Sequence, residues 1–110
     1  MGKAVLGEFE HHVLLATLRL GREAYTASIV QELEDVTGRG VAAAAVYIAL
    51  RRLEEGGLAV SEMRAPDNGL GSRSRRYFAP TALGIEKMDE SRARFRALWS
   101  GVETWLTDEG

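Results

Sequence analysis

The segment 41–58, VAAAAVYIALRRLEEGGL, constrains the fold of this chain more than any other. Wound at about 100° per residue, it places one set of apolar residues on a single helical face, which we expect in the core: Ala42, Val46, Ala49, Leu50 and Leu53. The opposite face carries Ala44, Ile48, Arg51 and Glu55. Gly56 or Gly57 can end the helix in a left-handed conformation, so we expect a strand from Leu58.

Two further helices are predicted before this segment. Residues 8–20, EFEHHVLLATLRL, repeat apolar residues at helical spacing and end at Gly21. A second helix begins with Thr26 as its N-cap, carries Ile29, Val30, Leu33 and Val36 inward, and ends near Gly38. Because a short glycine turn, residues 38–40, joins it to the third helix, the pair predicts a helix-turn-helix.

A β-hairpin is predicted next, with strands at 58–64 and 73–79 around a turn rich in glycine, proline and asparagine at 65–72. A helix-turn-helix followed by a hairpin is the element order of a winged helix, in which the hairpin is the wing. The fold class is therefore mainly α with a small β-hairpin (α+β), and residues 1–80 form the winged helix-turn-helix.

The last helix starts after Pro80 with Thr81 as its cap and is expected to run to about Thr107. Its seam residues step by three and four: Ile85, Met88, Arg92, Phe95, Trp99, Val102 and Leu106. This seam can pack on the first helix of the same chain or form a homodimer contact, and the two are compatible. We favour the homodimer, with Phe9 and Val13 of the first helix joining the interface. Residues 81–110 are then a dimerisation helix packed on the first helix, in one compact unit with the rest.

Composition excludes several classes of protein. At 110 residues the chain is long enough for one domain, and the absence of cysteine removes disulfides, thiol catalysis and cysteine-ligated zinc. We expect no signal peptide or membrane span, and therefore a cytoplasmic protein. His11 and His12 diverge by about 100° on a helix and cannot chelate one ion together, so no metal or other cofactor is expected. No catalytic constellation is present, and we do not expect an enzyme.

The net charge of −2 hides an uneven distribution. Residues 39–78 carry seven basic and four acidic groups, whereas residues 1–38 and 79–110 are both acidic in balance. Four arginines of the predicted wing face one acidic residue between positions 64 and 77: Arg64, Arg73, Arg75 and Arg76. The wing is therefore the part of the chain most suited to an anionic partner such as DNA.

The chain resembles the PadR family of bacterial transcriptional regulators over nearly its whole length, and four segments carry the likeness. They are Leu6-Gly7-Glu8-Phe9-Glu10 through Leu15; Ala24-Tyr25 through Ile29; Val46-Tyr47, Leu50, Arg52-Leu53-Glu54 and Gly57-Leu58; and Arg75-Arg76-Tyr77-Phe78 leading to Thr81 and Gly84. With a short chain and a single C-terminal helix, it is similar to the small subgroup of that family.

This resemblance implies a dimeric winged-helix repressor that binds a palindromic operator and is released by a small effector. In some short members flat aromatic compounds bind between aromatic residues of the last helix at the dimer interface, which would place Phe95 and Trp99 at such a site. Two features depart from the family pattern. Residues 42–45 are alanines where relatives open the third helix with a polar cap, and Ile48 stands where some have proline.

Each part of the expected DNA surface has its own role. Arg73, Arg75 and Arg76 on the wing, with Arg64 across the hairpin, are expected to bind phosphates. The remaining contacts are assigned to the helix-turn-helix: Arg51 to guanine or phosphate, Ala44 and Ile48 to thymine methyl groups, Tyr47 to phosphate, and Tyr25 and Thr26 to phosphate at the start of the second helix. Arg76 has an alternative role, an ion pair with Glu62.

An alternative function of a different class remains open: the winged helix could bind another protein and not DNA. In that case the seam and the exposed Ile48 would form the docking surface, and the wing would need no basic residues.

Overall fold

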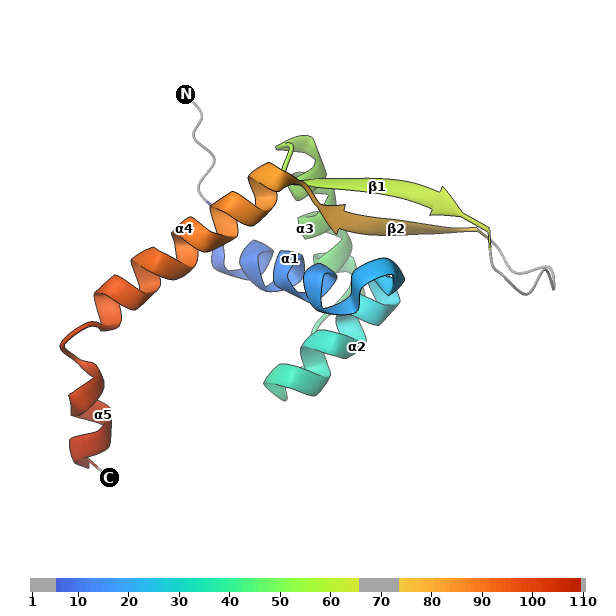
Figure 1. Cartoon of the computed structure of the whole chain (residues 1–110). Coiled ribbons are helices and arrows are strands. Elements are labelled where there is room, and N and C mark those ends of the chain that lie inside the picture. Colours follow the sequence, from blue (N-terminus) through green and yellow to red (C-terminus); the bar gives the residue numbers. More distant parts are fainter. Residues whose placement is uncertain (1–5, 66–73, 110) are drawn as a thin grey trace.

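The computed structural model describes residues 6–65 and 74–109, with side chains up to residue 106. Its elements follow the predicted order: α1 (Glu8–Leu20), the 3-10 turn η1 (Gly21–Glu23), α2 (Thr26–Thr37), α3 (Ala43–Glu55), β1 (Ala59–Arg64), β2 (Arg75–Pro80), α4 (Ala82–Trp99) and α5 (Glu103–Glu109). Figure 1 shows α1, α2 and α3 gathered in a central body, from which the hairpin and the α4–α5 arm project in opposite directions. The winged-helix prediction is confirmed.

The core lies where α1, α2 and α3 meet under the base of the hairpin. Leu14, Ile29 and Leu50, one from each helix, are fully buried, and Phe78 of β2 is 2% exposed. Burying a side chain of this size stabilises the fold by roughly 1.5–3 kcal/mol. This gain is larger than the cost of placing β-branched valine and isoleucine residues in helices. The prediction of burial is wrong for two residues. Val36 is 56% exposed, and Ala42 lies on the surface just before α3.

The start of α2 differs from the sequence-based expectation. Tyr25, and not Thr26, is the N-cap residue, and Ser28 Oγ accepts a hydrogen bond of 2.9 Å from the Tyr25 backbone N–H. The same hydroxyl donates to the Glu23 carbonyl at 2.6 Å. Ser28, three residues after the N-cap, therefore accepts a hydrogen bond from a free backbone N–H, which was the role expected of Thr26. Thr26 is the first residue of the helix. At the other end, Gly38 adopts φ 75°, which makes the sharp turn into α3 possible.

The hairpin is a two-stranded antiparallel sheet in which Ala59 pairs with Pro80 and Arg64 with Arg75. It begins one residue later than expected, because Leu58 is still folded back on α3, with its N–H bonded to the Leu53 carbonyl at 2.8 Å. Most of the turn expected at 65–72 lies outside the described residues. β2 also contacts the segment before α2, because Phe78 N–H donates to the Ala24 carbonyl at 2.8 Å.

The C-terminal helix begins as expected but is interrupted. Thr81 Oγ1 accepts from the Gly84 N–H at 3.0 Å, which confirms the predicted cap. The expectation of one continuous helix to Thr107 is wrong, because α4 ends at Trp99 and α5 starts at Glu103. Gly101, at φ 87°, breaks the helix between them. Val102 and Leu106 therefore do not continue the straight seam of α4.

Among residues 6–65 and 74–109, no helix is both long and apolar enough to span a bilayer.

Candidate nucleic-acid interface

The outer face of α3 presents the four residues of this helix that were assigned to DNA contacts. Ala44, Tyr47, Ile48 and Arg51 are exposed, while Val46, Ala49, Leu50 and Leu53 are buried behind them. Arg51 Nη1 donates to the Tyr47 hydroxyl at 3.1 Å. That hydrogen bond is the main cause that raises the pKa of Arg51 above its ordinary value. The two side chains form a polar pair beside the apolar Ala44 and Ile48, and Arg51 Nε also lies 3.7 Å from Glu54.

The turn into α3 is held without a side-chain cap from α3 itself. Ala42 is the N-cap residue and offers no acceptor, as the run of alanines implies. Glu34 of α2 compensates, because its Oε2 accepts a hydrogen bond of 3.0 Å from the Val41 N–H. Arg39 lies exposed in this turn, and no hydrogen bond or ion pair of its guanidinium is found within the described ranges. The sequence analysis did not include Arg39 among the expected DNA contacts, although this residue stands between the two glycines of the predicted turn.

On the wing, the two predicted arginines of β2 are both exposed. Arg76 Nη1 donates to Ser61 Oγ at 3.0 Å. The suggested ion pair between Arg76 and Glu62 is wrong, because Glu62 lies 3.0 Å from Arg64 Nε instead. The register explains this: Glu62 and Arg64 share one face of β1, whereas Arg76 lies on the other face of the sheet. Arg73 lies outside the described residues.

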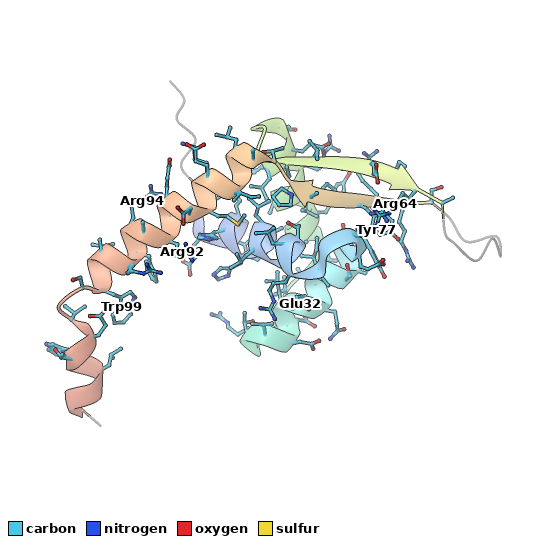
Figure 2. All side chains as sticks on the ribbon, viewed as in Figure 1. Glu32, Arg64, Tyr77, Arg92, Arg94 and Trp99 are labelled. Atoms are coloured by element: carbon cyan, nitrogen blue, oxygen red, sulfur yellow. The ribbon has the colours of Figure 1, made fainter. Side chains whose placement is uncertain are left out.

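Arg64 is held more tightly than a freely exposed phosphate-binding side chain. Its guanidinium carbon lies 3.7 Å from the centre of the Tyr77 ring, and Nη2 donates to the Arg22 carbonyl at 2.8 Å. With the ion pair to Glu62, the Arg64 side chain is only 28% exposed. Figure 2 shows Arg64 and Tyr77 together beside the hairpin.

Tyr25 and Thr26, expected at the start of α2, are both half-buried. The Tyr25 ring meets Tyr77 edge-on, with centroids 5.4 Å apart, and Arg75 lies over it at 4.4 Å. The hydroxyl of Tyr77, followed by Tyr25, raises the pKa of Arg75 above its ordinary value. Arg75 is therefore a permanent cation located where the wing meets α2.

The residues expected at a dimer interface fall into three environments. Val13 is fully buried and Met88 is 5% exposed, so both are core residues of their own chain. Phe9 lies in a hollow of about 530 Å³ with Ile48 and Arg52, on the α3 side of α1. The others are at or near the surface: Ile85, Arg92, Phe95, Trp99, Val102 and Leu106.

A groove of about 820 Å³ runs between α1 and α4. Its apolar lining includes Leu15 and Leu18 of α1, which are 44% and 45% exposed, and Phe95 and Leu98 of α4, at 64% and 75%. Figure 2 shows Arg92, Arg94 and Trp99 spread along α4 outside the helical body. Phe95 and Trp99 meet edge-on, with ring centroids 6.5 Å apart. Arg92 of the seam pairs with Asp89 of its own helix at 2.6 Å.

The two helices beside the groove are tied by His11, whose Nδ1 lies 3.0 Å from Ser91 Oγ. Burial, with a smaller contribution from His12, lowers the pKa of His11 below its ordinary value. Among residues 6–65 and 74–106, no group of three His, Cys, Asp or Glu side chains could hold a metal ion.

The family model described as the transcriptional regulator PadR-like family matches residues 14–90. The chain belongs to this family. The matched segment runs from the middle of α1 through the wing into α4, so it contains all the elements that form the surface described above. No significant match was found among curated proteins.

Solved structures of PadR-like regulators share this fold. A PadR family transcriptional regulator from Eggerthella lenta is 33% identical, with 87% of this chain and 84% of that chain covered and a TM-score of 0.65. A PadR-like transcription factor from Bacteroides fragilis is 26% identical, with 87% of each chain covered and a TM-score of 0.68. Bacillus subtilis PadR in complex with operator DNA is 15% identical over 76% of this chain and 46% of that chain, with a TM-score of 0.62.

Proposed function

We propose that this PadR-like chain is a DNA-binding repressor that acts as a homodimer on a palindromic operator, in the cytoplasm and without enzymatic activity. The observation that carries the proposal is the pair of exposed arginines on β2, Arg75 and Arg76, which project from a winged helix whose α3 face is also exposed. That Bacillus subtilis PadR has been solved with operator DNA supports the same use of the fold here.

In the proposed complex the wing supplies affinity and α3 supplies part of the selectivity. Arg75 and Arg76 bind phosphates, each adding about 0.9 to the slope of log K against log salt. On α3, Arg51 can reach a base edge or a phosphate, and Ile48 can contact a thymine methyl group. Because the remaining α3 surface is largely alanine, much of the selectivity must come from half-site spacing and from the deformability of the operator.

Support for the homodimer comes from α4 and α1. Exposed apolar side chains line both sides of their groove, and a single chain gains nothing by leaving them in water. A second copy that packs along α4 would cover them and place two α3 helices at a fixed separation. This spacing is what a palindromic operator requires.

A small aromatic effector would bind between Phe95 and Trp99 in this proposal. The two rings are edge-on in the single chain and stand on an exposed stretch of α4. In a dimer, the equivalent rings of both copies could enclose a flat ligand. A quenching titration of tryptophan fluorescence, compared between wild type and Trp99→Phe, tests this role. An aromatic ligand that quenches both proteins equally would exclude Trp99 from the site.

The proposed function is tested by titrating labelled DNA from the region flanking the protein's own gene at several salt concentrations. Arg75→Ala should flatten the slope of log K against log salt by about 2, one phosphate contact in each subunit. Lys87→Ala is the matched control, because Lys87 is a cation of α4, outside the wing, and is paired with Glu90. A slope that Arg75→Ala leaves unchanged would exclude the wing from phosphate binding.

A second function is favoured by one observation, the hollow of about 530 Å³ where Phe9 and Ile48 meet. A winged helix that binds a protein could use this apolar surface, with Ile48 as the anchor. The same titration separates the two functions. Binding that is neither sensitive to salt nor selective for sequence would favour the protein-binding module.

A further inference from the structure

We propose that Arg64 positions the wing and is not a DNA ligand. It acts through a stack of four side chains, here called the bracket: Arg64, Tyr77, Tyr25 and Arg75. The proposal rests on the DNA-binding function above and assigns separate tasks to two arginines that the sequence does not distinguish. Arg64 fixes the hairpin against the start of α2, and Arg75, at the other end of the bracket, meets the phosphate.

The bracket is continuous from one end to the other. The Arg64 guanidinium lies 3.7 Å from the Tyr77 ring centre, the two tyrosine rings meet at 5.4 Å and 68°, and Arg75 lies 4.4 Å from the Tyr25 ring centre. Two of the members come from β2, one from β1 and one from the segment before α2. The stack therefore crosses from the hairpin to the helix-turn-helix.

The Arg64 guanidinium is engaged within its own chain at two of its nitrogens and on one face. Its Nη2 donates to the Arg22 carbonyl at 2.8 Å, its Nε faces Glu62 at 3.0 Å, and one face of the guanidinium covers Tyr77. A phosphate that approached Nη2 or Nε would have to displace the carbonyl or the carboxylate. Arg75 differs, because it is exposed, and among the described residues its guanidinium stacks on the Tyr25 ring and lies beside the Tyr77 hydroxyl.

The wing needs such a bracket because little else joins it to the body along its length. A two-stranded sheet is marginally stable by itself, and Figure 1 shows the hairpin reaching well beyond the helices. Beyond its base, β2 is joined to the body by the hydrogen bond from Phe78 N–H to the Ala24 carbonyl and by the bridge between Tyr25 and Tyr77. The Arg64 contact to the Arg22 carbonyl extends this junction one step farther out.

The first test compares Arg64→Lys and Arg64→Met with Arg75→Ala in the salt titration. Lysine keeps the charge but lacks the planar group that stacks on Tyr77 while reaching a carbonyl and a carboxylate. If Arg64 is a positioning residue, both Arg64 variants should lose about tenfold in affinity and keep the wild-type salt slope. Arg75→Ala should flatten that slope by about 2. Thermal unfolding of each variant confirms that the body is folded.

Rescue by lysine would overturn the proposal. If Arg64→Lys binds like wild type while Arg64→Met flattens the slope as Arg75→Ala does, then Arg64 is an ordinary phosphate contact. Tyr77→Phe provides the conservative control, since it keeps the ring face on which Arg64 stacks. It should retain at least half of the wild-type affinity, and a tenfold loss there would show that the hydroxyl beside Arg75, and not the ring face under Arg64, is what matters.

A second test needs no DNA and so separates a failure of the bracket from a failure of the proposed function. Hydrogen exchange of the Phe78 amide, which is bonded to the Ala24 carbonyl, reports on the junction between the wing and the body. This amide should exchange about tenfold faster in Arg64→Lys than in wild type, while the amide of Leu50 in the core of α3 stays unchanged. Equal Phe78 exchange in the two proteins would show that Arg64 does not hold the wing.

Discussion

The winged-helix body buries many of its large apolar side chains, whereas the C-terminal arm leaves its own exposed. In the body, residues 6–80, each of α1, α2 and α3 contributes at least one fully buried apolar side chain to the centre. In the arm, beyond Met88 of α4, every apolar side chain that the structure describes is at least one third exposed, and Leu98 reaches 75%. Both parts carry large apolar side chains, but only the body packs many of them inside its own chain.

The difference shows that helical periodicity identifies an apolar face without identifying what covers it. The face of α3 is covered because α1 and α2 lie against it. The face of α4 is covered only near its start, where Gly84 and Met88 approach the body. The rest of that face remains available for the second copy proposed above.

The largest effect that this contrast predicts is on folding. Leu50→Ala in the core of α3 should lower the free energy of unfolding by about 2–5 kcal/mol. Leu98→Ala in the arm should change it by less than about 0.5 kcal/mol when measured at a protein concentration too low for association. Urea titrations of both variants test the contrast. Equal losses would mean that the arm is packed against its own chain.

Formation of the homodimer should depend on the arm and not on the exposed surface of α2. Phe95→Arg puts a charge in the middle of the proposed interface and should weaken the homodimer by at least about 100-fold, because an unpaired charge would be desolvated there. Sedimentation equilibrium measures this loss, and circular dichroism should show a folded body. Val36→Arg is the matched control, since Val36 is 56% exposed on α2 away from the groove. A Phe95→Arg variant that remains dimeric would exclude the α4 seam.

The junction between the two parts should tolerate no added side chain. A Cβ at Gly84 would lie 2.1 Å from the Leu58 carbonyl oxygen, so Gly84→Ala must displace α4 from the α3–β1 connection. We expect a loss of about 1–3 kcal/mol in unfolding free energy. At Gly40 the nearest atom to an added Cβ is 3.9 Å away, and Gly40→Ala should not lower stability. A stable Gly84→Ala protein would mean that α4 is not fixed there.

The smallest predicted effect is a pH dependence at the contact between α1 and α4. Burial lowers the pKa of His11 below its ordinary value of 6.5, so the unfolded chain takes up the proton more readily than the folded one. The stability that neutral His11 contributes is present above that value and is lost as the pH falls below it. Thermal unfolding between about pH 7.5 and 5.5 should show this loss in wild type.

His11→Asn should flatten that pH dependence, because it removes the titrating group. His12→Asn removes only the smaller of the two causes and should keep most of the loss. If His11→Asn and wild type lose equal stability over the same range, His11 is not responsible for the pH dependence.

The sequence determined the order of the elements, the core face of α3 and the basic wing, because each depends on local spacing. Apolar residues at intervals of three and four fix a helical face, glycines end the helices, and arginines alternating along a strand fix which of them share a side. The same local signals placed Ala44, Ile48 and Arg51 on one outer face, and the structure confirms this. Gly101 carried a signal for the break before α5, but the seam pattern concealed it.

Only the tertiary structure distinguished the surroundings of the two arginines that face each other across the hairpin. Arg64 and Arg75 are directly paired in the hairpin, and nothing in their local sequence separates them. Their difference comes from residues distant in the chain: Arg64 reaches the Arg22 carbonyl, 42 positions away, whereas Arg75 meets Tyr25 and stays exposed. Val13 was likewise assigned to the interface from its spacing and proved to be fully buried, because burial depends on which neighbours the fold supplies. A periodic pattern in the sequence specifies which face of a helix a residue lies on. Only the packing of the fold specifies which residues cover that face.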